Sequence, residues 1–344
     1  MTHKNIDKLI LFGGSRLLAD FVRYAKRGLS YELIVYGSKR HLDEKIPGDR
    51  RTLRQVLEKE RVKFFESPDI NRDKNLKGLV GKKTLGIAFG APWVFEKKTT
   101  RLFRPGYLLD FMGIDLPRYR GGAHYTWQIL HQNLEGCANL QIIRGGKETL
   151  HRGEVIKRLE YDLPARVRRP IDYFNFMAKK ELLFLKEFFR ELRQNKNFKI
   201  SKLNEAQSSY YPFLSTREQG FINWNWSGEQ IARFINAFGE PYAGASTYFD
   251  SNKAYVQECL LLNAPERYHP FTAGLVVRKD KKGVYVAAVG ALLHFRTVLD
   301  EKGKDVTRKI ELGQRFYTPH GDLDRAMTFR AVYNAQGQIG GKKI

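Results

Sequence analysis

A short apolar run that ends in two glycines lies near the start of this chain, and it constrains the fold more than any other feature. The run is KLILF (8–12), and it leads through Gly13, Gly14 and Ser15 into LLADFVRYA, where apolar residues recur at helical spacing. A buried strand, a glycine turn and an amphipathic helix in this order are typical of the first unit of a parallel α/β sheet.

The same alternation of strand and helix patterns continues to Gly90. YELIVYG (31–37), VKFFES (62–67) and TLGIAFG (84–90) read as strands, with a helix over TLRQVLEKE between the first two. This alternation predicts an α/β fold with a doubly wound, mostly parallel sheet and right-handed crossovers. The GSR turn after the first strand lacks the full G-x-G-x-x-G fingerprint, so a dinucleotide site has little support.

The second half of the chain shows a different pattern. Pro170 opens an amphipathic helix pattern that runs to about Gln194, and we interpret its apolar face as core packing. A polar stretch follows, and Ser227 then stands at a helix N-cap position before several short strands that indicate a small, OB-like β-barrel. We therefore predict an α/β domain over 1–198, a linker over 199–217, a β-barrel domain over 218–320 and a tail over 321–344, with its Gly-rich end disordered.

The charge of the chain is strongly positive. Lys and Arg total 60 against 37 Asp and Glu, a formal net charge of +23. This excess favours an anionic partner such as a nucleotide or nucleic acid, although a solvated basic surface explains it equally well. The two cysteines, Cys137 and Cys259, show no metal-ligand spacing, and no run of about 18 apolar residues is present. We expect a cytoplasmic protein with no metal and no membrane segment.

Four segments, met in order along the chain, carry a resemblance to a known family. They are GIAFGAPWVF (86–95), LPRYRGGAHYTWQIL (116–130), FINWNWSGEQIARFINAFGEPYAGAST (221–247) and GQRFYTP (313–319). The second is similar to the LPxYRG loop of the formyltransferases. The first resembles the strand and turn that line their folate pocket, and the last two resemble the start and end of their C-terminal domain. The resemblance implies that family's fold and its co-substrate, formyl-tetrahydrofolate.

The catalytic positions of that family are replaced in this chain. Counted back from Pro117, the family's Asn falls on Asp110, its His on Met112 and its small polar residue on Ile114, while its Asp falls on His151. Formyl transfer needs a donor to a developing oxyanion and a base for the amine proton, and loss of either costs roughly 100-fold or more in rate. An ionised Asp110 would repel the oxyanion unless burial raised its pKa.

Two histidines suggest a rearranged catalytic set. His124 stands where tRNA-type members of the family often have Pro, and His151 replaces their Asp. We predict that Asp110, His124 and His151 are the catalytic residues, since an ordinary His titrates near ~6.5 and can move protons. The alternative is that His124 is a hydrogen-bonded core residue.

The resemblance also implies a folate site, at Phe89, Gly90, Trp93, Arg120 and Gly121. Phe89 and Trp93 are explained as readily by core packing, and Arg120 by a structural ion pair. Further candidates for binding an anionic substrate are the cations Lys39, Arg40, Arg118 and Arg144.

The function implied by the resemblance is transfer of a formyl group to an amine, with an amino-sugar nucleotide as the favoured small anionic acceptor. Other readings stay open: a different transfer or hydrolysis in the same pocket, a catalytically inactive binding protein, or a methionyl-tRNA formyltransferase acting on tRNA. The resemblance also allows a homodimer.

Overall fold

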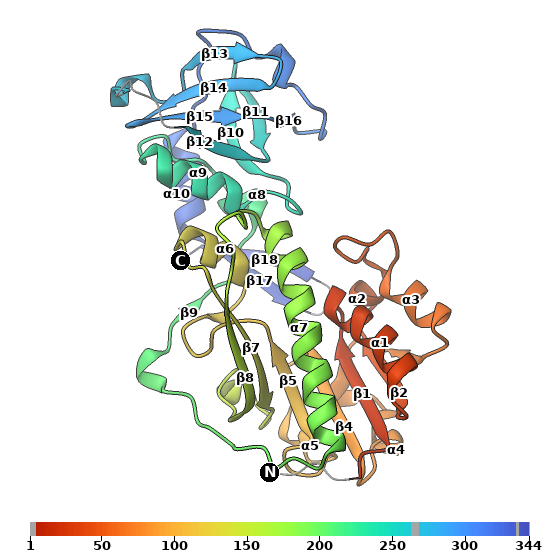
Figure 1. The fold of residues 1–344 in the computed structure, drawn as a ribbon. Helices are drawn as coiled ribbons and strands as arrows, with labels where there is room; N and C mark the ends of the chain where they lie inside the picture. The colour runs from red at the N-terminus through yellow and green to blue at the C-terminus, as the bar shows by residue number, and fades with distance from the viewer. Residues whose placement is uncertain (1–4, 263–267, 335–336, 344) are drawn as a thin grey trace.

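The computed structural model describes residues 5–262, 268–334 and 337–343, and its N-terminal half is built on one seven-stranded sheet (Figure 1). The strand order is β3-β2-β1-β4-β5-β7-β8. β1 to β5 pair in parallel, β7 pairs antiparallel with β5, and β8 pairs antiparallel with β7. The predicted doubly wound, mostly parallel sheet is confirmed. The strands are β1 (Lys8–Gly13), β2 (Glu32–Gly37), β3 (Lys63–Glu66), β4 (Thr84–Phe89), β5 (Leu108–Met112), β7 (Glu135–Ile142) and β8 (Val155–Asp162).

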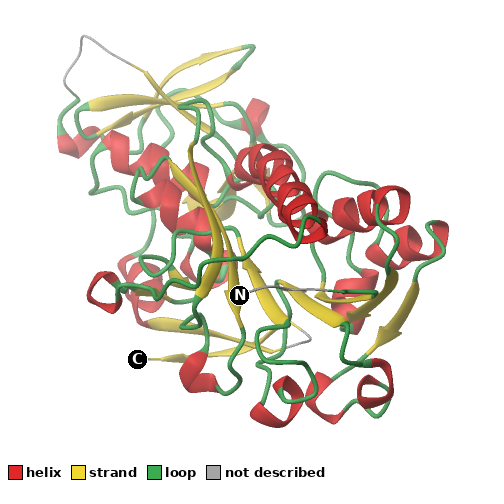
Figure 2. Ribbon diagram, turned by 60° about the horizontal axis from the view of Figure 1, so that its bottom comes forward, coloured by secondary structure: helices red, strands yellow, loops and turns green. Residues whose placement is uncertain are grey.

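Two helices, α1 and α7, pack beside each other on one face of this sheet, and Figure 2 shows the long α7 lying across it. Phe21 of α1 packs against Phe189 of α7, with ring centroids 5.1 Å apart, and both are buried in the core. Ser15 starts α1 by accepting a hydrogen bond from the Leu18 amide. The helices of this half are α1 (Arg16–Gly28), α2 (Lys39–Asp43), α3 (Leu53–Lys59), α4 (Leu76–Leu79), α5 (Lys97–Thr100), α6 (His124–Leu130) and α7 (Pro170–Arg193). No helix in the described ranges is long and apolar enough to cross a membrane.

The C-terminal half forms two antiparallel sheets, and helix α9 packs against strands of both. One sheet has the order β10-β11-β16 and the other β12-β15-β14-β13. Ser227 caps α9 as the sequence predicts, and Tyr173 and Met177 of α7 share the core of this half. The elements are α8 (Thr216–Gln219), α9 (Gly228–Ala237), β10 (Ala245–Phe249), β11 (Asn252–Val256), β12 (Cys259–Leu262), β13 (Val276–Asp280), β14 (Gly283–Ala288), β15 (Ala291–Phe295) and β16 (Val298–Asp300).

The polar segment that joins the two halves is pinned along the first sheet. Ser201 pairs with Val155 on β8, and the short strand β9 (Tyr210–Tyr211) pairs in parallel with β6 (Arg120–Gly121). The segment therefore packs against the loop that follows β5.

The tail is ordered where the structure describes it, so the expectation of a disordered Gly-rich end is wrong. Helix α10 (His320–Thr328) is followed by an antiparallel hairpin of β17 (Phe329–Asn334) and β18 (Gly337–Lys343). The Phe329 ring lies over Gly341, where any side chain would overlap it. Gly341 therefore allows the Phe329 ring to pack closely on the neighbouring strand. The sequence reading takes the glycines only as a sign of flexibility.

Candidate active site

Asp110 lies within β5 on the side of the sheet opposite α7. Its neighbour Phe111 points to Phe184 of α7, and successive side chains of a strand point to opposite faces. Asp110 is half-buried beside Ala88 of β4 and Gln141 of β7, and no described hydrogen bond or ion pair reaches its carboxyl. Desolvation by the surrounding protein raises the pKa of Asp110 to about 7. The carboxyl therefore exchanges between acid and carboxylate near neutral pH.

Met112, the next side chain on the same face as Asp110, belongs to an apolar cluster. It is buried with Ile114, Leu116 and Tyr119. Its register partner Asn139 donates from Nδ2 to the Ile114 carbonyl at 2.6 Å and to the Met112 carbonyl at 3.4 Å. The position that holds His in the resembling enzymes thus carries no proton chemistry here, and a buried amide fixes its backbone.

The turn between β7 and β8 carries His151 with a φ of 56°. Gln141 donates from Nε2 to the carbonyl of Gly153 at 2.7 Å. Gln141 lies directly opposite Asp110 on the neighbouring strand, and such residues have Cβ atoms about 5 Å apart. Gln141 therefore lies between Asp110 and the turn that carries His151.

His124 begins α6 and lies close to His151. Its Nε2 is 3.1 Å from the Gly121 carbonyl oxygen. Burial, and then the nearby His151, lower the pKa of His124 to about 4. Burial, and then the Arg120 guanidinium, lower the pKa of His151 to about 4. The structure thus brings the two histidines together as neutral imidazoles, while no described hydrogen bond or ion pair joins Asp110 to either.

Arg120 is 5% exposed, and its guanidinium joins three segments of the chain. Nε donates to the His151 carbonyl at 3.0 Å, and the two terminal nitrogens hold the Glu205 carboxylate with two contacts of 2.7 Å. One of these nitrogens also donates to Ser208 Oγ at 2.5 Å. Because these donors are engaged within the protein, the geometry favours the structural reading of Arg120 over folate binding.

Gly121 and Gly122 mark the crossing of the joining segment over this loop. Gly121 has a φ of 109°, and a side chain there would overlap the Tyr211 carbonyl oxygen. A side chain on Gly122 would overlap the Phe213 ring. Both glycines therefore make room for the protein's own backbone and side chains.

The other residues predicted to contact folate lie at the end of β4 and just after it, and they differ in how exposed they are. Phe89 is 1% exposed and packs on Phe21 and Phe111 in the core. Trp93 is also buried, and its Nε1 donates to the Pro68 carbonyl at 3.2 Å. Gly90 differs, since it is exposed with a φ of 61° and no neighbour lies within 4 Å of the place of its missing side chain.

The other cations predicted to bind an anionic substrate differ in whether they are paired with carboxylates. Arg118 pairs with Asp115 and Glu135, Arg144 holds Glu154 through two nitrogens, and Arg40 pairs with Glu44. Lys39 is exposed at the start of α2 and has no described ion pair.

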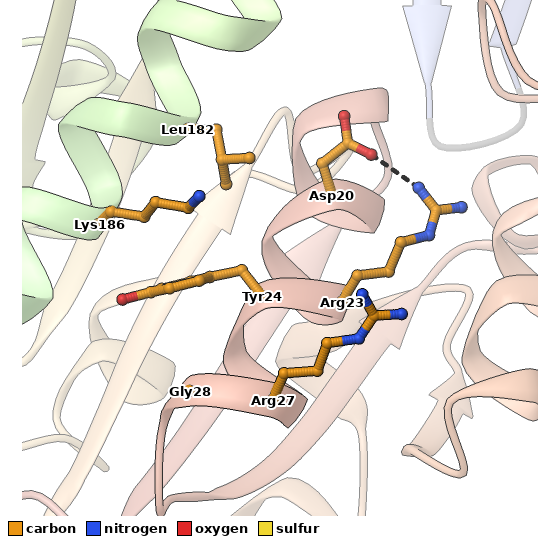
Figure 3. A pocket seen from close by; sticks show the side chains of 7 residues that line it. All are labelled: Asp20, Arg23, Tyr24, Arg27, Gly28, Leu182 and Lys186. Carbon is orange, nitrogen blue, oxygen red and sulfur yellow. Dashed lines mark hydrogen bonds and ion pairs between the residues drawn. The ribbon is translucent and has the colours of Figure 1, made fainter.

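A pocket of about 390 Å³ lies elsewhere, between α1 and α7 (Figure 3). Figure 3 shows cationic side chains around Tyr24, and the Lys186 ammonium lies 5.1 Å from the centre of its ring. Doubly wound sheets bind ligands at the carboxyl ends of their strands, whereas this pocket reaches the C-terminal end of α1. It is therefore not the candidate active site. Its lining residues are Asp20, Arg23, Tyr24, Arg27, Gly28, Leu182 and Lys186.

Sequence reasoning missed three buried polar residues: Asn139 and Gln141 beside the site, and Glu181 on helix α7. Asn139 and Gln141 interrupt the apolar strand β7 at alternate positions, which is a signal for one polar face. Glu181 of α7 is 6% exposed, and a side chain on Gly113 would overlap its carboxyl. Burial raises the pKa of Glu181 to about 7.

Known proteins resemble both halves of the chain. Residues 215–310 match the family described as "Formyl transferase, C-terminal domain". The methionyl-tRNA formyltransferase of Coxiella burnetii is 25% identical over 236 residues, which cover 69% of each chain. That of Clostridium acetobutylicum is 23% identical over 239 residues, covering 68% of this chain and 73% of the relative.

Solved structures share the fold. An N-formyltransferase from Helicobacter canadensis, in complex with folinic acid and dTDP-3-aminofucose, superposes with a TM-score of 0.63 at 16% identity and covers 85% of this chain and 99% of that one. HypX from Aquifex aeolicus, in complex with tetrahydrofolic acid, has a TM-score of 0.53 at 14% identity and covers 86% of this chain and 45% of that one. Residues 215–310 thus match a formyltransferase C-terminal domain, the chain is similar in sequence to methionyl-tRNA formyltransferases, and it shares its fold with solved formyltransferases.

Proposed function

We propose that this protein transfers a formyl group from formyl-tetrahydrofolate to a primary amine, with Asp110 as the group that moves the proton. The observation that carries the proposal is the half-buried Asp110 carboxyl, which has no described partner and a pKa of about 7. A catalytic acid or base works best when its pKa lies near the operating pH. Asp110 stands where the resembling enzymes have Asn.

The proposed step balances with these two substrates alone. The amine nitrogen attacks the formyl carbon, a C–N bond forms, and the carbonyl electron pair moves onto oxygen. The Asp110 carboxylate accepts the proton that the amine nitrogen loses. The oxyanion then collapses, the bond from the formyl carbon to the folate nitrogen breaks, and Asp110 returns the proton to that nitrogen.

His151 is the candidate donor to the oxyanion. A carbonyl oxygen only accepts, so the contact with Gly121 assigns the ring hydrogen of His124 to Nε2. The His151 ring has no described hydrogen bond, and its neutral imidazole keeps one N–H for the substrate. Loss of such a donor typically costs about 100 to 1000-fold in rate. His124 then acts as a positioning residue beside it.

The folate is expected along the turn after β4. Open space at Gly90 lets a flat ring approach the backbone. Phe89, Trp93 and Arg120 support this site from the core rather than touching the folate, since their surfaces or donors are already engaged.

The favoured acceptor is an amino sugar linked to a nucleotide. The solved N-formyltransferase in complex with dTDP-3-aminofucose shares this fold over 99% of its own length. Lys39 lies just beyond the carboxyl end of β2, where a cation would face the diphosphate of such an acceptor. Binding without turnover is the second candidate, and the apolar cluster around Met112 favours it.

The test is an assay of the full chain with isotopically labelled formyl-tetrahydrofolate and a panel of nucleotide-linked amino sugars, with mass spectrometry of the products. Labelled formamide that disappears in Asp110→Asn supports the proposal. Equal turnover in Asp110→Asn contradicts the role of Asp110. Folate binding without any product supports the binding protein instead.

A further inference from the structure

The C-terminal hairpin reaches the loop that carries the candidate site. The Phe213 ring fills the space over Gly122, and the Tyr333 ring packs on Phe213 with centroids 4.9 Å apart. The Tyr333 hydroxyl donates to the Leu214 carbonyl at 3.1 Å. Tyr333 is thus the outer layer of a stack whose base is the loop after β5.

The hairpin also approaches the segment that follows β2, at the same edge of the sheet. Burial raises the pKa of Tyr333, and the nearby Arg40 guanidinium acts to lower it. Arg40 follows β2, whereas Gly122 follows β5. β1 and β4 lie between those two strands in the sheet. Tyr333 therefore lies between the segments that follow β2 and β5, at the edge where doubly wound sheets bind ligands. Figure 1 shows β17 and β18 between the C-terminal half and the sheet, behind α7 in that view.

The base of the hairpin is tied to the segment that precedes α9. Gln219 of α8 donates from Nε2 to the Phe329 carbonyl at 3.0 Å, and α10 packs against α8. The hairpin is held at its base by this hydrogen bond and further along by Tyr333. Loss of the Tyr333 side chain would remove the contact with Phe213 and leave the hydrogen bond at the base in place.

We propose that the hairpin is a lid that restricts the acceptor to small amines, and that Tyr333 is the residue that sets this specificity. The inference rests on the proposed function and names its acceptor class. A nucleotide-linked sugar fits beneath a strand pair, whereas a tRNA must bring its aminoacylated end to the sheet edge at which Tyr333 lies. The closed hairpin therefore selects against tRNA.

The experiment compares three full-length proteins: the unchanged chain, Tyr333→Ala and the control Tyr317→Ala. Tyr317 is 40% exposed and packs against the Tyr248 ring in the C-terminal half, so Tyr317→Ala removes a comparable ring outside the hairpin. Binding of initiator methionyl-tRNA is measured at one fixed salt concentration, because phosphate contacts make the affinity salt-dependent. We expect Tyr333→Ala to bind tRNA about tenfold more tightly and Tyr317→Ala to stay within about twofold.

A locked variant tests the same contact in the opposite direction. Phe213→Cys and Tyr333→Cys are combined and joined by a short bismaleimide, while the native Cys137 and Cys259 are buried and protected from the reagent. The unjoined double variant should bind tRNA as Tyr333→Ala does. Joining the two cysteines should return the affinity to that of the unchanged chain.

Equal tRNA affinity in all of these proteins would overturn the lid. Weaker binding by Tyr333→Ala would also overturn it, and would make the hairpin part of a tRNA surface. Titration of the same samples with a formyl-folate analogue separates the two proposals. Folate binding together with an unaltered tRNA affinity refutes the lid alone, whereas absence of folate binding in every sample refutes the proposed function and the acceptor role of the lid with it.

Discussion

The Nε atom of Arg120 donates to the carbonyl oxygen of His151 at 3.0 Å, and so joins the loop after β5 to the turn between β7 and β8. Glu205, from the segment between the two halves, holds the other end of the same guanidinium. One buried cation thus fixes the backbone of three segments around the candidate site. Arg120 therefore positions the backbone of His151.

Arg120→Lys should lower the free energy of unfolding by about 2 to 4 kcal/mol, because an ammonium cannot reproduce the fork of donors and leaves partners of a buried pair unsatisfied. Glu205 is half exposed, which keeps the loss below that of a fully buried pair. Urea unfolding measures it. Arg144→Lys is the matched control, since Arg144 also holds a carboxylate, that of Glu154, through two nitrogens but is half exposed, and its replacement should cost less than about 1 kcal/mol. Equal losses would show that Arg120 has no special structural role.

Glu181→Gln should change how stability depends on pH. Burial raises the folded-state pKa of Glu181 from 4.5 to about 7, so between these values the folded protein holds a proton that the unfolded chain has lost. The free energy of unfolding of the unchanged chain therefore falls as pH rises through this window, by up to about 3 kcal/mol at pH near 8. Glu181→Gln cannot ionise, so the variant should not show this fall. Unfolding is followed at about pH 5 and pH 8. Glu187→Gln, half exposed on the same helix, serves as the control, and a parallel pH dependence in the two variants would refute the burial of a protonated Glu181.

Asn139→Ala should destabilise the loop after β5. Asn139 is fully buried and satisfies the Ile114 carbonyl, so its loss leaves a buried acceptor unpaired and costs about 1 to 3 kcal/mol. The exposed Asn225→Ala should leave the unfolding midpoint unchanged. If both variants unfold at the midpoint of the unchanged chain, the Asn139 amide does not hold this loop.

The rate of formyl transfer should rise with pH through about 7. Asp110 accepts a proton only as the carboxylate, which replaces the acid as pH passes its raised pKa. The histidines, with pKa values of about 4, remain neutral over this range and add no second limb. The profile of kcat/KM is measured for the unchanged chain and for Asp110→Asn, after circular dichroism has shown both to stay folded. A midpoint near 7 that persists in Asp110→Asn would assign the titration to another group.

Local patterns predicted the elements well because short-range physics forms them. The run ending at Gly13 and Gly14 is strand β1 and its turn, and Ser227 caps α9. The helix from Pro170 to about Gln194 was predicted nearly to its ends, although its buried face includes Tyr173, Met177 and Glu181, which the apolar spacing passed over.

Contacts between distant segments could not be predicted in the same way. Arg120 and Glu205 are 85 residues apart, and no sequence pattern links a loop arginine to a linker carboxylate. The docking of Tyr333 on Phe213 likewise requires a hairpin that a Gly-rich tail did not suggest. The raised pKa of Asp110 depends on burial that only the packed sheet provides.

The central claim is that this chain keeps a formyl-folate site although Asn, His and Asp of the family are replaced by Asp110, Met112 and His151. The most direct measurement is a calorimetric titration of the full chain with a stable formyl-dideazafolate. We expect binding in the micromolar range, weakened when Gly90→Val fills the open turn after β4. Absence of binding up to millimolar analogue would contradict the claim.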